Sequence, residues 1–218
     1  MPASAPPRRG AATRARLISA ALELFATRGY HATTTALLAE RTRIAEGTIY
    51  RHFPGKDALY SAVCRSVWER LDEHLEASLA LRLPTRDRLA DAARNLVRAA
   101  ELDPAAIRLQ SRPLELAVLD DLARDARLEF RDHVTQLVAA GKQEGAIRAG
   151  AAEWWGSLWL AVVWSTCERV AGGELTAEHP NVGLAIDAAW DMVRSDRDES
   201  ARQAESAETT GGSPMGAD

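Results

Sequence analysis

The chain has 218 residues, of which 46% are hydrophobic and 27% are charged, as in an ordinary globular protein. It holds no apolar run of the about 18–20 residues that a membrane-spanning helix needs, and no apolar signal-peptide segment follows its basic N-terminus. These features argue against a membrane partner and predict a cytoplasmic protein of one or two domains.

Charge is unevenly distributed along the chain. Residues 1–56 hold nine Arg or Lys and three Glu residues, a net charge of +6, whereas the rest of the chain holds 18 basic and 28 acidic residues, a net charge of −10. A basic segment attached to an acidic body suggests that the basic segment meets a polyanion such as nucleic acid. A chance fluctuation of surface charge would give the same imbalance.

Residues that commonly bind metals or perform catalysis are present, but not at the required spacing. Cys64 and Cys167 form no CxxC pair, and the five histidines show no HxxxH or HExxH pattern. The chain also lacks the GxSxG, GxGxxG and Walker A patterns. We therefore expect no metal, no cofactor and no enzymatic activity, and we expect both cysteines to be reduced and buried.

Taken in chain order, the hydrophobic periodicity predicts helices and no strands. Residues 1–12, rich in Ala, Pro and Arg, are expected to form a disordered basic arm. From Thr13, apolar residues recur every three or four positions up to Gly29, which is expected to end the first helix. The predicted helices cover residues 13–28, 35–42, 45–51, 57–81, 85–101, 104–112, 114–141, 151–171 and 180–193, and residues 196–218 are expected to be a disordered tail.

Two of these helices, 35–42 and 45–51, are short and are joined by a turn at Thr42–Arg43. This arrangement is typical of a helix-turn-helix, whose second helix can enter the major groove of DNA. That helix carries Thr48 and Tyr50, whose hydroxyl groups suit phosphate oxygens. A short helix pair with scattered arginines also occurs in other helical proteins, so these residues alone leave both interpretations open.

Residues 16–63, RLISAALELFATRGYHATTTALLAERTRIAEGTIYRHFPGKDALYSAV, resemble the DNA-binding domain of the TetR family of bacterial repressors. The most specific part is the run GTIYRHF at residues 47–53, with Lys56 and Leu59 after it. The resemblance implies an all-α fold: an N-terminal three-helix DNA-binding domain and a C-terminal helical domain for ligand binding and dimerisation. The expected division is an arm of residues 1–12, a DNA-binding domain of residues 13–56, an effector-binding domain of residues 57–195 and a tail of residues 196–218.

The resemblance also implies roles for individual residues. Ile49 and Phe53 match core positions of the family, and Arg14 and Arg16 are weaker candidates for contacts with the DNA backbone. The residues that match DNA-contacting positions are Thr34, Thr35, Ala45, Glu46, Thr48, Tyr50, His52 and Lys56.

The chain departs from the family pattern around the turn. Arg43 stands where the family commonly has Gly, so either Arg43 adopts a left-handed conformation or the turn is reshaped. Ala45 replaces a capping Ser or Thr, a loss of about 1 kcal/mol of local stability. Glu46 would repel phosphate unless it accepts a hydrogen bond from cytosine or pairs with Arg43 or Arg51.

The acidic remainder is expected to bind an effector and to form a homodimer. Its tryptophans could line an apolar cavity or pack in the core, and its polar residues could contact a ligand or face solvent. The candidate ligand-binding residues are Gln110, Arg112, Glu115, Trp159, Trp164, Cys167 and Glu168. The last two helices are implied to pair with those of a partner, and the candidate interface residues are Trp154, Ala161, Ser165, Ala188 and Trp190.

The sequence therefore predicts a ligand-responsive repressor, a homodimer that binds a near-palindromic operator in double-stranded DNA and is released by a small apolar or amphipathic effector. One alternative is an activator or a corepressor-dependent regulator. Another is a helical protein that binds small molecules and whose head has lost DNA binding.

Overall fold

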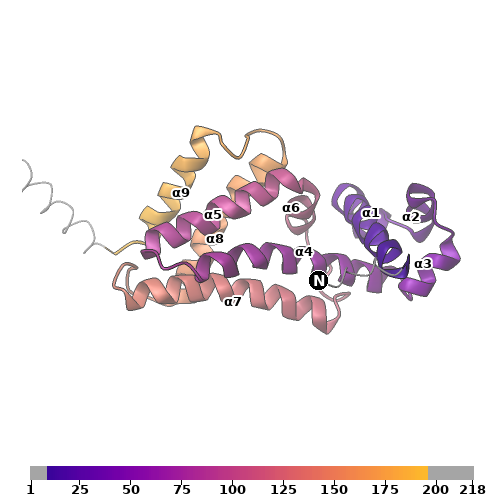
Figure 1. The fold of residues 1–218 in the computed structure, drawn as a ribbon, viewed down its shortest axis with the longest axis horizontal. Helices are drawn as coiled ribbons and strands as arrows, with labels where there is room; N and C mark the ends of the chain where they lie inside the picture. Colours follow the sequence, from indigo (N-terminus) through magenta and orange to yellow (C-terminus); the bar gives the residue numbers. More distant parts are fainter. Residues whose placement is uncertain (1–8, 196–218) are drawn as a thin grey trace, which may run out of the picture.

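The computed structural model describes residues 9–195, which fold into helices from end to end (Figure 1). In this part of the chain the only extended pairing is an isolated antiparallel bridge between Ile147 and Arg194. The expected all-α fold is confirmed. The helices are α1 (Arg9–Ala32), α2 (Thr35–Thr42), α3 (Glu46–His52), α4 (Lys56–Leu79), α5 (Thr85–Leu102), α6 (Pro104–Gln110), α7 (Asp121–Gln143), α8 (Ala152–Ala171) and α9 (Pro180–Val193).

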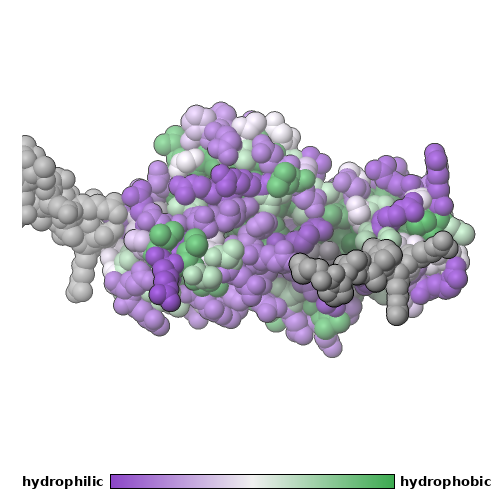
Figure 2. All heavy atoms as spheres, viewed as in Figure 1, coloured by the Kyte–Doolittle hydropathy of each residue, from purple (hydrophilic) through white to green (hydrophobic). Residues whose placement is uncertain are grey.

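The molecule is elongated, with a small head made of α1, α2 and α3 at one end and a body made of the other helices (Figure 1). In the body, α4 and α7 lie side by side along the long axis, α8 packs on α5 and α7, and α9 packs on α8. The helix α6 connects the two parts because it packs on α1 as well as on α8. The face seen in Figure 2 is largely hydrophilic, with small separate groups of hydrophobic side chains.

The first helix differs from the prediction at both ends. It begins at Arg9, so residues 9–12 of the expected arm are helical; residues 1–8 and the expected tail of residues 196–218 lie outside the described part of the chain. Gly29 breaks the helix as expected, with φ 80° and ψ 172°, a conformation that glycine adopts readily. The chain then turns helically again as far as Ala32, so Gly29 makes a kink rather than an end.

The prediction that a helix begins at Leu114 is wrong. Residues 111–120 form an irregular connection, and α7 begins only at Asp121. Two hydrogen bonds hold this connection on α4: the Ser61 hydroxyl donates to the Val118 carbonyl and accepts from the Asp120 amide, both at 3.1 Å. The Asp120 side chain then caps α7 by accepting from the Ala123 amide at 2.9 Å, so the cap and a distant serine decide where the helix starts.

A single hydrophobic core runs through the head and the body. In the head, the ring of Phe25 packs edge-on against Tyr60 of α4, with centroids 5.1 Å apart. In the body, Trp68 of α4 packs against Phe130 of α7 at 5.2 Å. Thus α4 contributes side chains at both ends of the core.

Both cysteines, Cys64 and Cys167, are fully buried and form no disulfide, which confirms the expected burial. Burial raises the pKa of each thiol to about 12, because the interior disfavours the charged thiolate. No helix within residues 9–195 is long and apolar enough to cross a membrane.

A substitution of Gly141 tests how tightly the body is packed where Gly141 meets Thr85 and Ile147. A methyl group there would lie 2.9 Å from the Ile147 side chain and still closer to Thr85, so Gly141→Ala should lower the free energy of unfolding by about 1–3 kcal/mol. Chemical denaturation at fixed protein concentration measures this. Gly183→Ala in α9 is the control, because a methyl group there meets nothing within 4 Å; an equal loss in both variants would contradict the packing argument.

Candidate nucleic-acid interface and ligand groove

The turn between α2 and α3 keeps the tight geometry of a helix-turn-helix although it lacks glycine. Arg43 adopts the left-handed conformation, with φ 53° and ψ 36°, so the first of the two expected alternatives is the one observed. The Ile44 amide donates to the Ala39 carbonyl at 3.3 Å, which closes the end of α2. From α1, the Arg16 guanidinium donates to the Thr42 carbonyl at 3.2 Å and ties the turn to the rest of the head.

The helix α3 has one buried side and one exposed side. Ile49 and Phe53 are 1% and 3% exposed, so both residues lie in the core as predicted. On the other side Ala45, Glu46 and Tyr50 face solvent, and half of the Tyr50 surface is accessible. A short helix anchored from behind can enter a DNA groove without unfolding.

Three of the predicted DNA-contacting residues form one hydrogen-bonded group. The Thr35 hydroxyl donates to the Glu46 carboxylate at 2.5 Å and lies 3.3 Å from the Tyr50 hydroxyl. Glu46 therefore has Thr35 as its partner, rather than Arg43 or Arg51. The Arg51 guanidinium donates to the Thr48 hydroxyl at 3.0 Å, so Thr48 is also held in place.

The caps of the two helices differ. Thr34 caps α2, because its hydroxyl accepts from the Leu37 amide at 3.2 Å. At α3, Ala45 makes no side-chain cap, as the sequence predicted. The hydroxyl of Thr34 is thus already engaged with the backbone, while its side chain stays exposed.

Lys56 and His52 lie where the chain passes from α3 into α4, and both are half-buried. The Lys56 ammonium donates to the Tyr30 carbonyl at 3.2 Å and lies 4.2 Å from the centre of the Tyr30 ring. The Tyr30 hydroxyl in turn donates to Asp57, and burial together with this carboxylate raises the pKa of Tyr30 to about 12. Lys56 therefore also joins the end of α1 to the start of α4.

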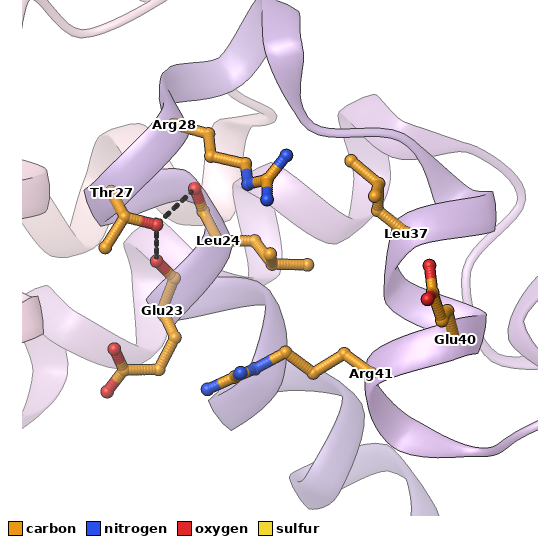
Figure 3. A pocket seen from close by; sticks show the side chains of 7 residues that line it. All are labelled: Glu23, Leu24, Thr27, Arg28, Leu37, Glu40 and Arg41. Atoms are coloured by element: carbon orange, nitrogen blue, oxygen red, sulfur yellow. Dashed lines mark hydrogen bonds between the residues drawn. The ribbon is translucent and has the colours of Figure 1, made fainter.

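A hollow of about 500 Å³ lies between α1 and α2 (Figure 3). Two arginines and two glutamates line it, so its charges balance and it is no anion site. None of the predicted DNA-contacting residues takes part. Its lining consists of Glu23, Leu24, Thr27, Arg28, Leu37, Glu40 and Arg41.

Four of the candidate ligand-binding residues gather where α6 ends. Arg112 and Glu168 line a groove of about 370 Å³ between α1, α6 and α8, which we call the α6 groove. The Trp164 indole donates to the Ser111 hydroxyl at 3.3 Å, and Gln110 is the neighbour of Ser111. The remaining lining residues are Ala26, Ile107, Arg108, Ser111, Ala171 and Gly172.

The other three candidates lie elsewhere. Trp159 and Cys167 are 1% and 0% exposed and pack in the core. Glu115 contacts His31 of the head, with 3.0 Å between His31 Nε2 and Glu115 Oε1. The sequence had no signal for two further residues of this region: Arg108, which donates to the Ala171 carbonyl at 2.5 Å, and Trp68, whose ring stacks on that of Trp164 at 6.5 Å.

Arg112 joins the body to the head. Its Nε and Nη2 donate to the carbonyls of Ala26 and Thr27, both at 2.8 Å. These carbonyls belong to the last turn of α1 before the kink at Gly29, where the regular helical hydrogen bonding ends. One planar guanidinium can serve two neighbouring carbonyls, which an ammonium group does less well.

The candidate interface residues fall into two groups. Trp154, Ala161, Ser165 and Ala188 are exposed on α8 and α9, and Trp154 is 60% accessible. Trp190, however, is only 4% exposed and packs in the core of its own protomer, so its placement at the seam is wrong. Its position on α9 faces inward because Ile186, Ala189 and Val193 share that side of the helix.

Within residues 9–195, no three His, Cys, Asp or Glu side chains are grouped so that they could hold a metal ion.

Residues 17–63 match the sequence pattern of the family described as bacterial regulatory proteins, tetR family. The chain is 41% identical over 51 residues to the uncharacterised HTH-type regulator YvkB of Bacillus subtilis, which is 23% of this chain and 27% of YvkB. It is 28% identical over 160 residues to the HTH-type transcriptional activator FasR of Mycolicibacterium smegmatis, covering 65% of this chain and 71% of FasR. The YvkB match thus spans about a quarter of that relative, whereas the FasR match spans most of both proteins.

The fold also resembles solved structures. A TetR family transcription regulator from Marinobacter aquaeolei superposes with a TM-score of 0.74 over 86% of this chain and 98% of that one, at 19% identity. This likeness extends the shared fold from the head to the body.

Replacing Arg112 tests the connection between the two parts. Arg112→Gln should lower the free energy of unfolding by about 1–2 kcal/mol, because it removes a charged donor from two carbonyls. Chemical denaturation followed by tryptophan fluorescence measures this. The control is Arg124→Gln, whose partner Asp121 is an exposed neighbour on the same helix, and whose loss should be below about 0.5 kcal/mol. Equal losses would show that Arg112 contributes no more than a surface ion pair.

Proposed function

Because residues 17–63 match the tetR family of bacterial regulatory proteins, we propose that the chain is a DNA-binding, non-enzymatic regulator of this family, a homodimeric repressor whose heads bind a near-palindromic operator. In this proposal residues 13–56 bind DNA, residues 57–195 bind the effector and form the dimer, and the protein acts in the bacterial cytoplasm. DNA and a second copy of the chain are its macromolecular partners.

The observation that carries the proposal is the exposed polar side of α3. Ile49 and Phe53 anchor the helix from behind, which leaves Glu46, Thr48 and Tyr50 available to a major groove. Thr34, Thr35, His52 and Lys56 flank this side and supply hydroxyl and cationic groups for phosphates. Ala45 offers a small apolar contact. Glu46 would accept from cytosine N4 if Thr35 turned its hydroxyl toward a phosphate.

Selection of bound duplexes from a random DNA pool, at about physiological salt, tests this proposal. We expect one enriched near-palindrome with half-sites about one helical turn apart. Tyr50→Ala should then weaken binding to that operator at least tenfold while leaving the unfolding transition unchanged, because Tyr50 is exposed.

Leu122→Ala is the matched control, since Leu122 is a large exposed side chain on α7, a helix of the body. Tyr50 is a better choice than Lys56, because the Lys56 ammonium also holds Tyr30 and its loss would disturb the head itself. Failure of the folded, dimeric protein to enrich any sequence would favour the alternative in which the head has lost DNA binding.

The proposed dimer uses the exposed sides of α8 and α9. Leu184 and Trp154 are 67% and 60% exposed, and the small residues Ala161, Ser165 and Ala188 between them would allow close helix approach. If α8 and α9 packed against the same two helices of a second copy, this surface would be buried in a four-helix bundle.

Leu184→Glu should convert the dimer to a monomer at micromolar concentration, because two carboxylates would meet at the seam. Sedimentation velocity measures this change. Leu128→Glu is the control, since Leu128 is 59% exposed on α7; a monomeric wild-type protein, or a dimer that survives Leu184→Glu, would contradict the proposed seam.

Repression is the simpler direction of regulation, because a dimer seated on a promoter can block transcription without further contacts. The opposite direction has one observation in its favour: FasR, which aligns with most of this chain, is named an activator. Transcription from a promoter with the selected operator, with and without the protein, separates the two. In either case a small, largely apolar effector in the body would shift the equilibrium between two arrangements of the heads.

A further inference from the structure

The side-chain amide of Gln110, a partly buried residue, stands out among the buried polar groups of residues 9–195. Both its amide oxygen and its amide nitrogen are buried and lack a hydrogen-bond partner in this part of the chain. The other buried atoms in this condition are single nitrogens of Trp68, Arg88 and Trp190. Burying an unpaired amide is unfavourable, and an aliphatic side chain of similar size would avoid the penalty. The amide at this position therefore points to a partner from outside the chain.

A series of contacts leads from Trp68, the second unpaired group of this region, to the residue that follows Gln110 in the chain. The ring of Trp68, whose indole N–H is unpaired, stacks on Trp164 at 6.5 Å. Trp164 donates to the Ser111 hydroxyl, and Ser111 both lines the α6 groove and neighbours Gln110. A ligand that entered from the α6 groove would displace the Trp164–Ser111 hydrogen bond and reach the Gln110 amide beside an aromatic wall.

The charges around this region argue for an uncharged ligand group. At the rim, Arg108 and Arg112 donate to backbone carbonyls at helix ends, and the third charged lining residue, Glu168, is exposed to solvent. In the core of the protein, Asp72 is hydrogen-bonded to His133 at 2.7 Å, and burial raises the pKa of the Cys64 and Cys167 thiols, which keeps them neutral. A buried ligand charge would find no free counter-charge among these groups, and burying an unpaired charge is strongly unfavourable.

We propose that Gln110 binds the buried end of the effector and that this end is an uncharged group with a donor next to an acceptor, such as a lactam or an amide. Such a group forms two hydrogen bonds with one carboxamide, because its N–H donates to the Gln110 oxygen and its carbonyl accepts from the Gln110 nitrogen. This assignment rests on the proposed function, in which the body binds an effector.

The test compares Gln110→Leu with the wild-type protein by thermal unfolding. Removing the unpaired amide should raise the Tm by about 2–5 °C without any ligand. The lactam 2-quinolinone should raise the Tm of the wild type and bind Gln110→Leu at least tenfold more weakly. Naphthalene, which has the same shape but no polar atoms, and 2-naphthoate, which is charged, should bind the wild type more weakly than 2-quinolinone.

Gln136→Leu is the matched control, because Gln136 is exposed on α7 and bonds only Asp132. Gln110→Met, which also lacks the amide, should follow Gln110→Leu and guards against a failure of leucine to fit. A Tm of both Gln110 variants below that of Gln136→Leu would overturn the assignment, because the amide would then stabilise the protein itself. The assignment would also be overturned if the wild type bound 2-naphthoate more tightly than 2-quinolinone or did not bind 2-quinolinone at all. Equal affinity of 2-quinolinone for Gln110→Leu and the wild type would overturn it as well.

These outcomes are separate from a failure of the proposed function. Operator selection uses the wild-type protein without effector, so it decides whether the chain is a DNA-binding regulator regardless of Gln110.

Discussion

The packing of α4 against both the head and the body is the constraint on which the rest of the structure depends. Tyr60, near its start, packs on Phe25 of α1, while Trp68, two turns later, packs on Phe130 of α7. A straight helix transmits a tilt over its whole length, so the body cannot shift α4 without moving the head. Because protein interiors are close-packed, α4 can move only between positions in which its side chains pack well on both neighbours.

The connection of residues 111–120 adds a second link that bypasses α4. Arg112 holds the last turn of α1 before its kink, and Glu115 reaches His31 beyond it. Farther along, Ser61 fixes the same connection to α4. Because Ser111 lines the α6 groove, a molecule in that groove would lie next to both links. Hydrogen bonds therefore join the lining of the α6 groove to the head over a short path.

At three positions the packing of the folded chain decided what the sequence left open or predicted differently. The hydrophobic pattern after Leu114 is compatible with helix, but Ser61, more than 50 residues away, offers hydrogen bonds that hold residues 118–120 in an irregular form. Trp190 has the composition of an interface residue, yet its side of α9 belongs to the core. Glu46 could have paired with an arginine, and the fold instead brings Thr35 to it. For the connection and for Glu46, the deciding partner lies on another helix, and for Trp190 the buried side of α9 decides.

The sequence by itself determined what depends on local periodicity and short-range chemistry. The number and order of the helices within residues 9–195, the uncapped start of α3 and the burial of Ile49 and Phe53 follow from residues within one or two turns of one another, whereas the structure chose the left-handed conformation of Arg43 over a reshaped turn. Only the tertiary structure decided which side chains meet across helices. It brings Arg112 to α1 and leaves the Gln110 amide unpaired, because hydrogen-bond satisfaction in the interior is a property of the whole packing arrangement and cannot be read from spacing along the chain.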